Sequence, residues 1–175
     1  MKYIITTDTH LGHEKMLKWG RPPDFEKKIL KGLESVASHS AILIHLGDIC
    51  IGNDRANNRL LTSIPFFKKY LIRGNHDRKS NEWYLQNGWD MVCNTMGLGY
   101  NGDEIIFSHM PVNLEGGAIN IHGHFHDVEA KRIMAKEPHL YAISQKPAHV
   151  LLSLERNCYM PFNLDTIVKN LTNKQ

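Results

Sequence analysis

The sequence has few cysteines, and they follow no pattern. Cys50, Cys93 and Cys158 are the only three in 175 residues; they lie far apart and their number is odd. A disulfide framework or a cysteine-rich zinc site needs paired or closely spaced cysteines. We therefore expect free thiols in a reducing compartment.

Long apolar runs are lacking as well. No stretch approaches the roughly 20 apolar residues that a membrane-spanning helix needs, and Met1-Lys2 runs directly into a strand-like segment without a signal-peptide pattern. Repeats, low-complexity tracts and long linkers are missing, so residues 1–175 are interpreted as one domain. These features predict a cytoplasmic protein with no membrane association.

No strong excess of one charge is present. The net charge is +3, from 21 Lys and Arg against 18 Asp and Glu. This small net positive charge suits an anionic substrate, but it is much smaller than the positive charge typical of a nucleic-acid-binding protein. We expect no dedicated nucleic-acid-binding domain, and the composition indicates no particular oligomeric state.

Histidine is the residue type that stands out, with 11 copies. Histidines gathered in short clusters are typical of metal sites, because neutral imidazole is a common metal ligand. The eight that lie in or beside such clusters are His10, His13, His45, His76, His109, His122, His124 and His126.

Hydrophobic periodicity predicts an α/β (α+β) protein, with a mixed sheet or two packed sheets flanked by helices. Ser80 is a candidate N-cap, and Asn101-Gly102 is a strong hairpin-turn signal. Helices are expected over 24–37, 54–63, 80–87 and 163–171. Strands are expected over 3–7, 41–46, 66–72, 96–100, 104–108, 118–122, 140–144 and 149–154.

Five of these strand-like runs are followed directly by residues that bind metals. Active sites of sheet proteins gather where strands end and loops begin, so the five ends are expected to converge. Residues two apart in an extended chain point to the same side, which predicts that each pair serves one spot. In chain order the groups are Asp8 and His10; Asp48; Asn75, His76 and Asp77; His109; and His124 and His126.

The ordered motifs TDTH, LGD, RGNHD, FSH and HGHFH resemble those of the calcineurin-like metallophosphoesterase superfamily, in particular its small stand-alone bacterial and phage-type members. The resemblance implies an αββα sandwich with a dinuclear metal site at the strand ends. One ion would be held by Asp8, His10, Asp48 and His126. The other would be held by Asp48, Asn75, His109 and His124, with Asp48 as the bridge.

This ligand set suits the chemistry of phosphate esters. Two divalent ions bring four positive charges against two carboxylates, so the centre stays cationic and attracts phosphate. The mixed nitrogen and oxygen shell without thiolate fits borderline ions, namely Fe, Zn, Ni or Co and, as our preferred choice for activity, Mn²⁺. The expected cofactor is therefore a pair of divalent or trivalent metal ions.

The implied activity is phosphoric ester hydrolysis, with a phosphodiester preferred over a monoester. A metal-bridging hydroxide attacks phosphorus in line, and His76 assists the leaving group while Asp77 orients His76. Asn75, His76, Arg78 and His13 are the expected contacts to a small phosphate ester, with nucleotides among the candidates.

Further polar residues are candidates for supporting roles. Arg73, Arg21 and Asn53 are weaker candidates for phosphate contact. Glu155 stands at a strand end as a candidate partner of a ligand histidine. His45 is expected in the core, and residues 127–136 are expected to form a solvated loop.

Three other functions stay open. The alternation of His122, His124 and His126 is also found in histidine-triad nucleotide hydrolases, although Gly123 interrupts that pattern. A catalytically silent scaffold of the same fold is the second alternative, and the intact His76 argues against it. A nuclease is the third, and the modest charge disfavours it.

Overall fold

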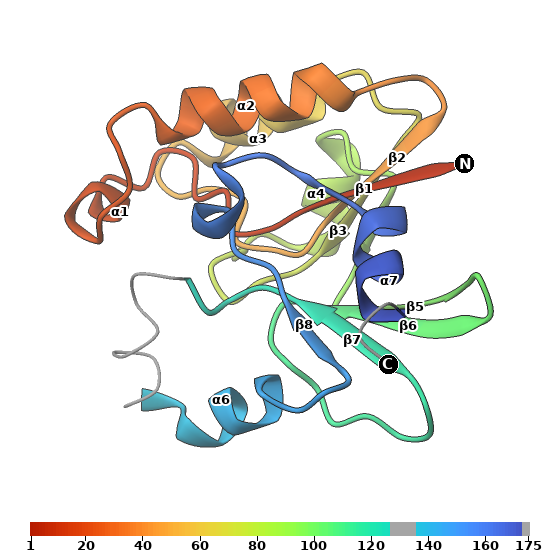
Figure 1. Ribbon diagram of the computed structural model, residues 1–175. Helices are drawn as coiled ribbons and strands as arrows, with labels where there is room; N and C mark the ends of the chain where they lie inside the picture. Colours follow the sequence, from red (N-terminus) through yellow and green to blue (C-terminus); the bar gives the residue numbers. More distant parts are fainter. Residues whose placement is uncertain (127–135, 173–175) are drawn as a thin grey trace.

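The computed structural model describes residues 1–126 and 136–172. Two β-sheets pack face to face (Figure 1). Helices α2 and α3 cover the outer face of one sheet, and α6 lies by the other. The predicted α/β sandwich of two mixed sheets flanked by helices is confirmed.

The first sheet has the strand order β4-β3-β2-β1-β9. β1, β2, β3 and β4 run parallel, and β9 pairs antiparallel with β1. Because the four parallel strands end on the same edge, the loops that follow them lie together. The strands are β1 (Lys2–Thr6), β2 (Ala41–His45), β3 (Lys68–Ile72), β4 (Met91–Cys93) and β9 (Phe162–Asn163).

The second sheet has the order β5-β6-β7-β8. β5 and β6 form the predicted hairpin, and both of its turn residues, Asn101 and Gly102, have the positive φ that a tight two-residue turn requires (54° and 92°). β6, β7 and β8 run parallel. The strands are β5 (Thr95–Tyr100), β6 (Asp103–Ser108), β7 (Ile119–His122) and β8 (His149–Leu151).

Alternating side chains in the central strands separate two cores. Ile4 and Leu43 belong to the apolar cluster beneath the helices, whereas Ile5, Ile42 and Ile44 belong to the cluster between the sheets. Both faces of β1 and β2 are thus covered, which explains why their sequences are continuously apolar. The sheet that carries the first motifs is held rigidly from both sides.

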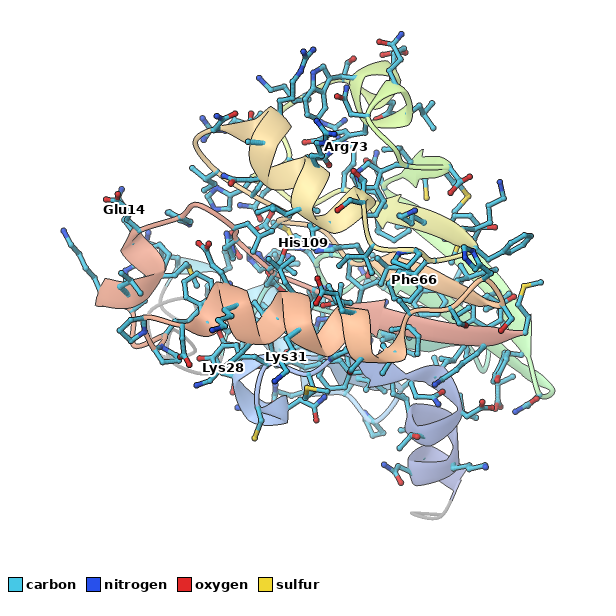
Figure 2. The ribbon with its side chains drawn as sticks, turned by 90° about the horizontal axis from the view of Figure 1, so that it is seen from above. Glu14, Lys28, Lys31, Phe66, Arg73 and His109 are labelled. Atoms are coloured by element: carbon cyan, nitrogen blue, oxygen red, sulfur yellow. The ribbon has the colours of Figure 1, made fainter. Side chains whose placement is uncertain are left out.

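The helices follow their sequence patterns. α2 buries Phe25, Ile29 and Leu33 and turns Lys28 and Lys31 to solvent (Figure 2). The helices are α1 (Lys15–Lys18), α2 (Phe25–Val36), α3 (Asp54–Thr62), α4 (Asn81–Gln86), α6 (Pro138–Ser144) and α7 (Leu164–Thr172), with a 3₁₀ turn at Glu155–Asn157. None in the described part of the chain has the length and apolar character of a membrane span.

One predicted strand is wrong. Residues 140–144 belong to helix α6, whose first residue is Pro138. Proline is preorganised for the first turn of a helix, and a short apolar run does not by itself distinguish helix from strand. The short elements α1, β4 and β9 escaped detection because two to four residues show no periodicity.

Candidate metal centre

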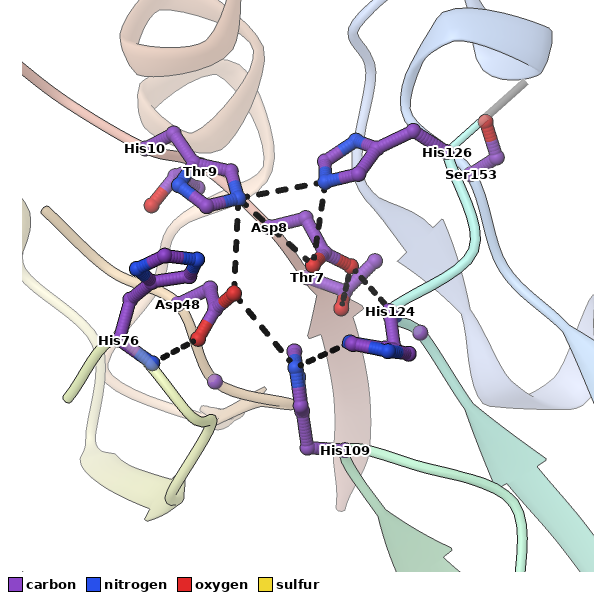
Figure 3. A network of polar contacts seen from close by, with 12 residues as sticks. Thr7, Asp8, Thr9, His10, Asp48, His76, His109, His124, His126 and Ser153 are labelled. Carbon is purple, nitrogen blue, oxygen red and sulfur yellow. Dashed lines mark hydrogen bonds and ion pairs between the residues drawn. The ribbon is translucent and has the colours of Figure 1, made fainter. Parts of the chain in front are cut away.

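The seven predicted metal ligands lie together at the carboxyl ends of the strands, and all of them except Asn75 are labelled in Figure 3. The first sheet supplies four of them, after β1, β2 and β3, and the second sheet supplies three, after β6 and β7. All except Asn75 and His124 are fully buried. The seven are Asp8, His10, Asp48, Asn75, His109, His124 and His126.

One half of the cluster is formed by Asp8, His10 and His126. The Nε2 atoms of the two histidines are 3.2 Å apart. Asp8 Oδ1 lies 3.9 Å from His10 Nε2 and 3.6 Å from His126 Nε2. These three donor atoms face one another closely enough to share a single cation.

The other half is formed around His109. Its Nε2 lies 3.5 Å from Asp48 Oδ2, 2.9 Å from Asn75 Oδ1 and 3.1 Å from His124 Nδ1. Asp48 Oδ2 is also 3.5 Å from His10 Nε2, so this carboxylate stands between the two halves. From this position Asp48 would be able to contact an ion in either half.

The donor atoms fit metal ions. Asp8 Oδ1 is buried and faces the cluster without a hydrogen-bond partner, as a metal-binding oxygen would in the absence of its ion. Burial lowers the pKa of His10 well below its ordinary value, which leaves the neutral imidazole that binds metals. Burial and the neighbouring Asp8 raise the pKa of Asp48 to about 8, and a cation between these carboxylates would favour their ionised forms.

Two ligand histidines are oriented by oxygen acceptors on the side away from the cluster. His109 Nδ1 is 2.8 Å from the Leu46 carbonyl oxygen, and His124 Nε2 is 2.8 Å from Glu137 Oε2. Each of these nitrogens donates its hydrogen outward, so the other nitrogen turns its lone pair to the centre. Glu137 lies outside every motif, and the sequence carried no signal for it.

His126 is oriented by a buried ion pair. Its Nδ1 lies 3.1 Å from Glu155 Oε1, and the same oxygen accepts a 2.8 Å hydrogen bond from Arg21 Nε. Burial alone raises the pKa of Glu155, but the hydrogen bond to His126 and the Arg21 charge outweigh it and hold the pKa below its usual range. The expected contact between Glu155 and a ligand histidine is present.

Arg21 is not placed to meet phosphate. Its guanidinium is buried over the Phe25 ring and donates to the backbone oxygens of Asp8 and Thr9. It therefore clamps the loop after β1 from behind. The predicted phosphate contact is corrected, because the cation is fully engaged inside the protein.

Four of the ligands have strained backbones. Asp8, His10, Asp48 and His124 have φ values of 48°, 48°, 57° and 70°, in the left-handed region that non-glycine residues rarely adopt. Such conformations cluster at functional sites, where surrounding contacts enforce them. Convergence thus comes from sharp turns and not from the expected extended alternation.

The second predicted pair, His124 and His126, is divided between the two halves of the cluster. His126 joins His10 and Asp8, whereas His124 contacts His109 in the other half. The expectation that residues two apart would serve one spot is therefore wrong for this pair. The left-handed turn at His124 sends the two rings to different halves of the cluster.

Two glycines allow the loops to meet. A Cβ atom at Gly74 would lie 2.1 Å from Asp48 Oδ1, and one at Gly123 would lie 2.4 Å from Asp8 Oδ2. Both distances are far inside van der Waals contact, so only glycine fits. The glycines thus bring the loops after β3 and β7 against the two carboxylates.

His76 and His13 lie at the mouth of the cluster. The His76 ring is half-buried, with its centroid 5.5 Å from that of His10, and its backbone N–H donates to Asp48 Oδ1 at 2.8 Å. His13 Nδ1 is 3.4 Å from His10 Nδ1. Burial, followed by the nearby Arg78 charge, lowers the pKa of His76. Arg78 is exposed on the same side.

Asp77 does not have the expected contact with the His76 imidazole. Its Oδ2 accepts hydrogen bonds from the N–H groups of Asp48 and Gly74, both at 2.8 Å, and its Oδ1 accepts one from Ile49 at 3.0 Å. The adjacent side chains diverge, and Asp77 points into the protein. It ties the loop after β3 to the loop after β2, instead of orienting His76.

Other candidates have structural contacts. Arg73 donates to the carbonyl oxygens of Asp77 and Lys79, and Asn53 caps α3 by accepting from the Ala56 N–H. Neither arrangement points to phosphate. Of the loop expected at 127–136, residues 127–135 lie outside the described part of the chain.

Two further histidines stand outside the cluster. His45 is buried and contacts Thr9 Oγ1 at 3.0 Å, as expected of a core histidine. The His122 ring packs against Phe125 and His149. Since His122 does not join His124 and His126, the three rings do not form the constellation that a histidine-triad hydrolase needs.

The comparisons with known proteins identify the family of this chain. The family model for the calcineurin-like phosphoesterases matches residues 1–168. The chain belongs to this family, whose members depend on metal ions. No curated protein matches the chain significantly.

Three solved structures are similar to this chain. A protein of unknown function from Aquifex aeolicus, AQ665, superposes with a TM-score of 0.71 at 22% identity, over 96% of this chain and 98% of that one. A phosphoesterase from E. coli, Yfce, gives 0.47 at 17% identity, over 71% and 69%. An archaeal phosphodiesterase gives 0.45 at 18% identity, over 72% and 73%.

Proposed function

We propose that this chain hydrolyses phosphodiesters with the help of two adjacent metal ions, of which Mn²⁺ is the preferred pair. The observation that carries the proposal is the cluster of seven donor residues, which includes the buried Asp8 Oδ1 that lacks a hydrogen-bond partner. When bound, two such ions would supply an activated water and stabilise charge on the phosphoryl oxygens. Asp8, His10, Asp48 and His126 would hold one, and Asp48, Asn75, His109 and His124 the other.

The residues at the mouth of the cluster are placed where they could contact a substrate. His76 is fixed by its backbone bond to Asp48, so its ring has a defined place beside the cluster. We assign it to the leaving oxygen, where an imidazole N–H stabilises developing charge. The substrate would be a small phosphate ester, with nucleotides included, held by Asn75, His76, Arg78 and His13.

A preference for diesters is supported by the space next to His76. A cleft of about 440 Å³ lies there, lined by residues that include His13, His76 and Arg78. A monoester carries one organic group, whereas a diester carries two and needs room for both. The cleft offers room for a second organic group beside the proposed catalytic histidine.

The test compares bis-p-nitrophenyl phosphate with p-nitrophenyl phosphate after metal removal and after reloading with Mn²⁺. We expect hydrolysis to stop with chelator, to return with Mn²⁺ and to favour the diester. Activity that survives complete metal removal would contradict the proposal, and so would the absence of Mn²⁺-dependent hydrolysis of either compound. A scaffold of the same fold would give the latter result.

The role of His76 is tested by His76→Ala. We expect turnover of diesters with poor leaving groups to fall by about 10²- to 10⁴-fold, which is the usual contribution of a general acid. Calorimetry should show Mn²⁺ binding close to that of the parent protein, because the ring is not among the metal ligands. Unchanged turnover would remove His76 from the reaction.

A further inference from the structure

The cleft beside His76 carries positive charge that lies outside the metal centre. Two of its lining residues, Lys15 and Arg78, are exposed cations. Neither side chain forms a salt bridge or a hydrogen bond within residues 1–126 and 136–172. They belong to different walls, since Lys15 begins α1 and Arg78 follows the loop after β3.

The acidic groups of the cleft do not offset these cations. Asp54 is its one lining carboxylate among the described residues, and its Oδ2 is already paired with Lys79 Nζ at 3.2 Å. Burial and the nearby Asp54 raise the pKa of the lining Cys50 thiol to about 12, so it adds no negative charge. The cleft is therefore cationic and suited to an anion.

The cleft is also continuous with the metal centre. His13 and His76 line it, their rings lie 6.0 Å apart, and both rings contact His10 of the centre. The cleft therefore extends from the metal centre towards Lys15 and Arg78. A group bound between Lys15 and Arg78 would therefore lie beside His76, where the proposed function places an organic group of the ester.

We propose that the substrate carries a second phosphate, which binds between Lys15 and Arg78. The inference rests on the proposed function, because it concerns the organic part of the same ester. A phosphate monoester dianion has the charge to meet two cations, and its oxygens suit the planar fork of a guanidinium. The substrate class is thus a phosphodiester, such as a nucleotide diester, whose organic part carries a second phosphate as a monoester.

The experiment measures equilibrium binding of thymidine 5′-phosphate and thymidine 3′,5′-bisphosphate to the Mn²⁺-loaded protein by calorimetry. The two nucleotides differ by one phosphate. We expect the bisphosphate to bind at least about tenfold more tightly than the monophosphate, because one charge-assisted hydrogen bond contributes about that much affinity. Lys15→Ala and Arg78→Ala should each reduce this preference, and the double variant should abolish it.

The matched control is Lys18→Ala, which removes another exposed lysine of the same helix that does not line the cleft. It should keep the preference of the parent. Equal affinity of the parent for both nucleotides would overturn the inference, and so would a preference that persists in the double variant. Hydrolysis of bis-p-nitrophenyl phosphate by the parent tests the proposed function separately, so the two failures are distinguishable.

Discussion

At the scale of single residues, the least expected feature is the buried pair Arg21–Glu155 behind His126. Glu155 accepts from the His126 ring, and Arg21 binds both Glu155 and the backbone of Asp8. A carboxylate behind a ligand histidine fixes its tautomer and orientation. The Arg21–Glu155 pair thus helps to position both His126 and Asp8, which belong to the same half of the centre.

We predict that Glu155→Leu weakens Mn²⁺ binding by about 10- to 100-fold, the usual cost of losing such a partner. Glu155→Gln keeps an oxygen that can accept from His126 Nδ1, and should recover much of the affinity. Calorimetric titration with Mn²⁺ measures both. Melting curves taken in parallel report how far each variant destabilises the fold.

Glu34→Leu is the control, because Glu34 is exposed on α2. If Glu155→Leu bound Mn²⁺ as tightly as the parent, the carboxylate would have no part in holding His126. If Glu155→Gln were as impaired as Glu155→Leu, the negative charge and not the hydrogen bond would be the important property.

At the scale of elements, the loops after the strands depend on close backbone approach. The loop after β7 passes so near the loop after β1 that a Cβ atom at Gly123 would lie 2.0 Å from Thr7 Oγ1. The His124 N–H in the same loop donates to Asp8 Oδ2 at 3.0 Å. The contact therefore sets the positions of ligands from both sheets at once.

We predict that Gly123→Ala lowers both stability and metal affinity. Overpacking of this kind costs about 1–3 kcal/mol, and relief of the clash must move Asp8 or His124. Urea unfolding and Mn²⁺ titration measure the two effects. Gly117→Ala is the matched control, since nothing lies within 4 Å of its added Cβ. Parent-like Mn²⁺ affinity in Gly123→Ala would show that this close approach is unimportant for the site.

At the scale of the whole molecule, the centre joins the two sheets. Asp8, His10, Asp48 and Asn75 follow strands of the first sheet, and His109, His124 and His126 follow strands of the second. Ions bound to both sets would bridge the sandwich at one edge. Unfolding separates the sets, so metal binding must favour the folded protein.

We therefore predict that Mn²⁺ raises the melting temperature. At a free concentration of 100 times the dissociation constant, one site adds about 2.7 kcal/mol, which corresponds to about 5–10 °C for a chain of this size. Scanning calorimetry with Mn²⁺ and with chelator measures the shift. Asp48→Asn should lose most of it, and an equal shift in that variant would argue against binding at this centre.

Features that depend on residues adjacent in the chain were predictable from the sequence, whereas contacts between distant residues were not. Ile4, Ile5 and their neighbours in β1 and β2 were recognisable as buried strands because burial on both faces makes a strand continuously apolar. The turn at Asn101-Gly102 was recognisable because its geometry depends on two adjacent residues. Both features are local.

What the sequence by itself determined is the set of strands and the polar residues that follow them, because parallel strands must end on a common edge and their loops must meet there. Only the tertiary structure decided which remote groups complete the site. It turned Asp77 inward to three backbone N–H groups, withdrew Arg21 from the substrate side and brought Glu137 to His124. Those contacts depend on left-handed turns and on segments distant in the chain, and neither is encoded in a local pattern.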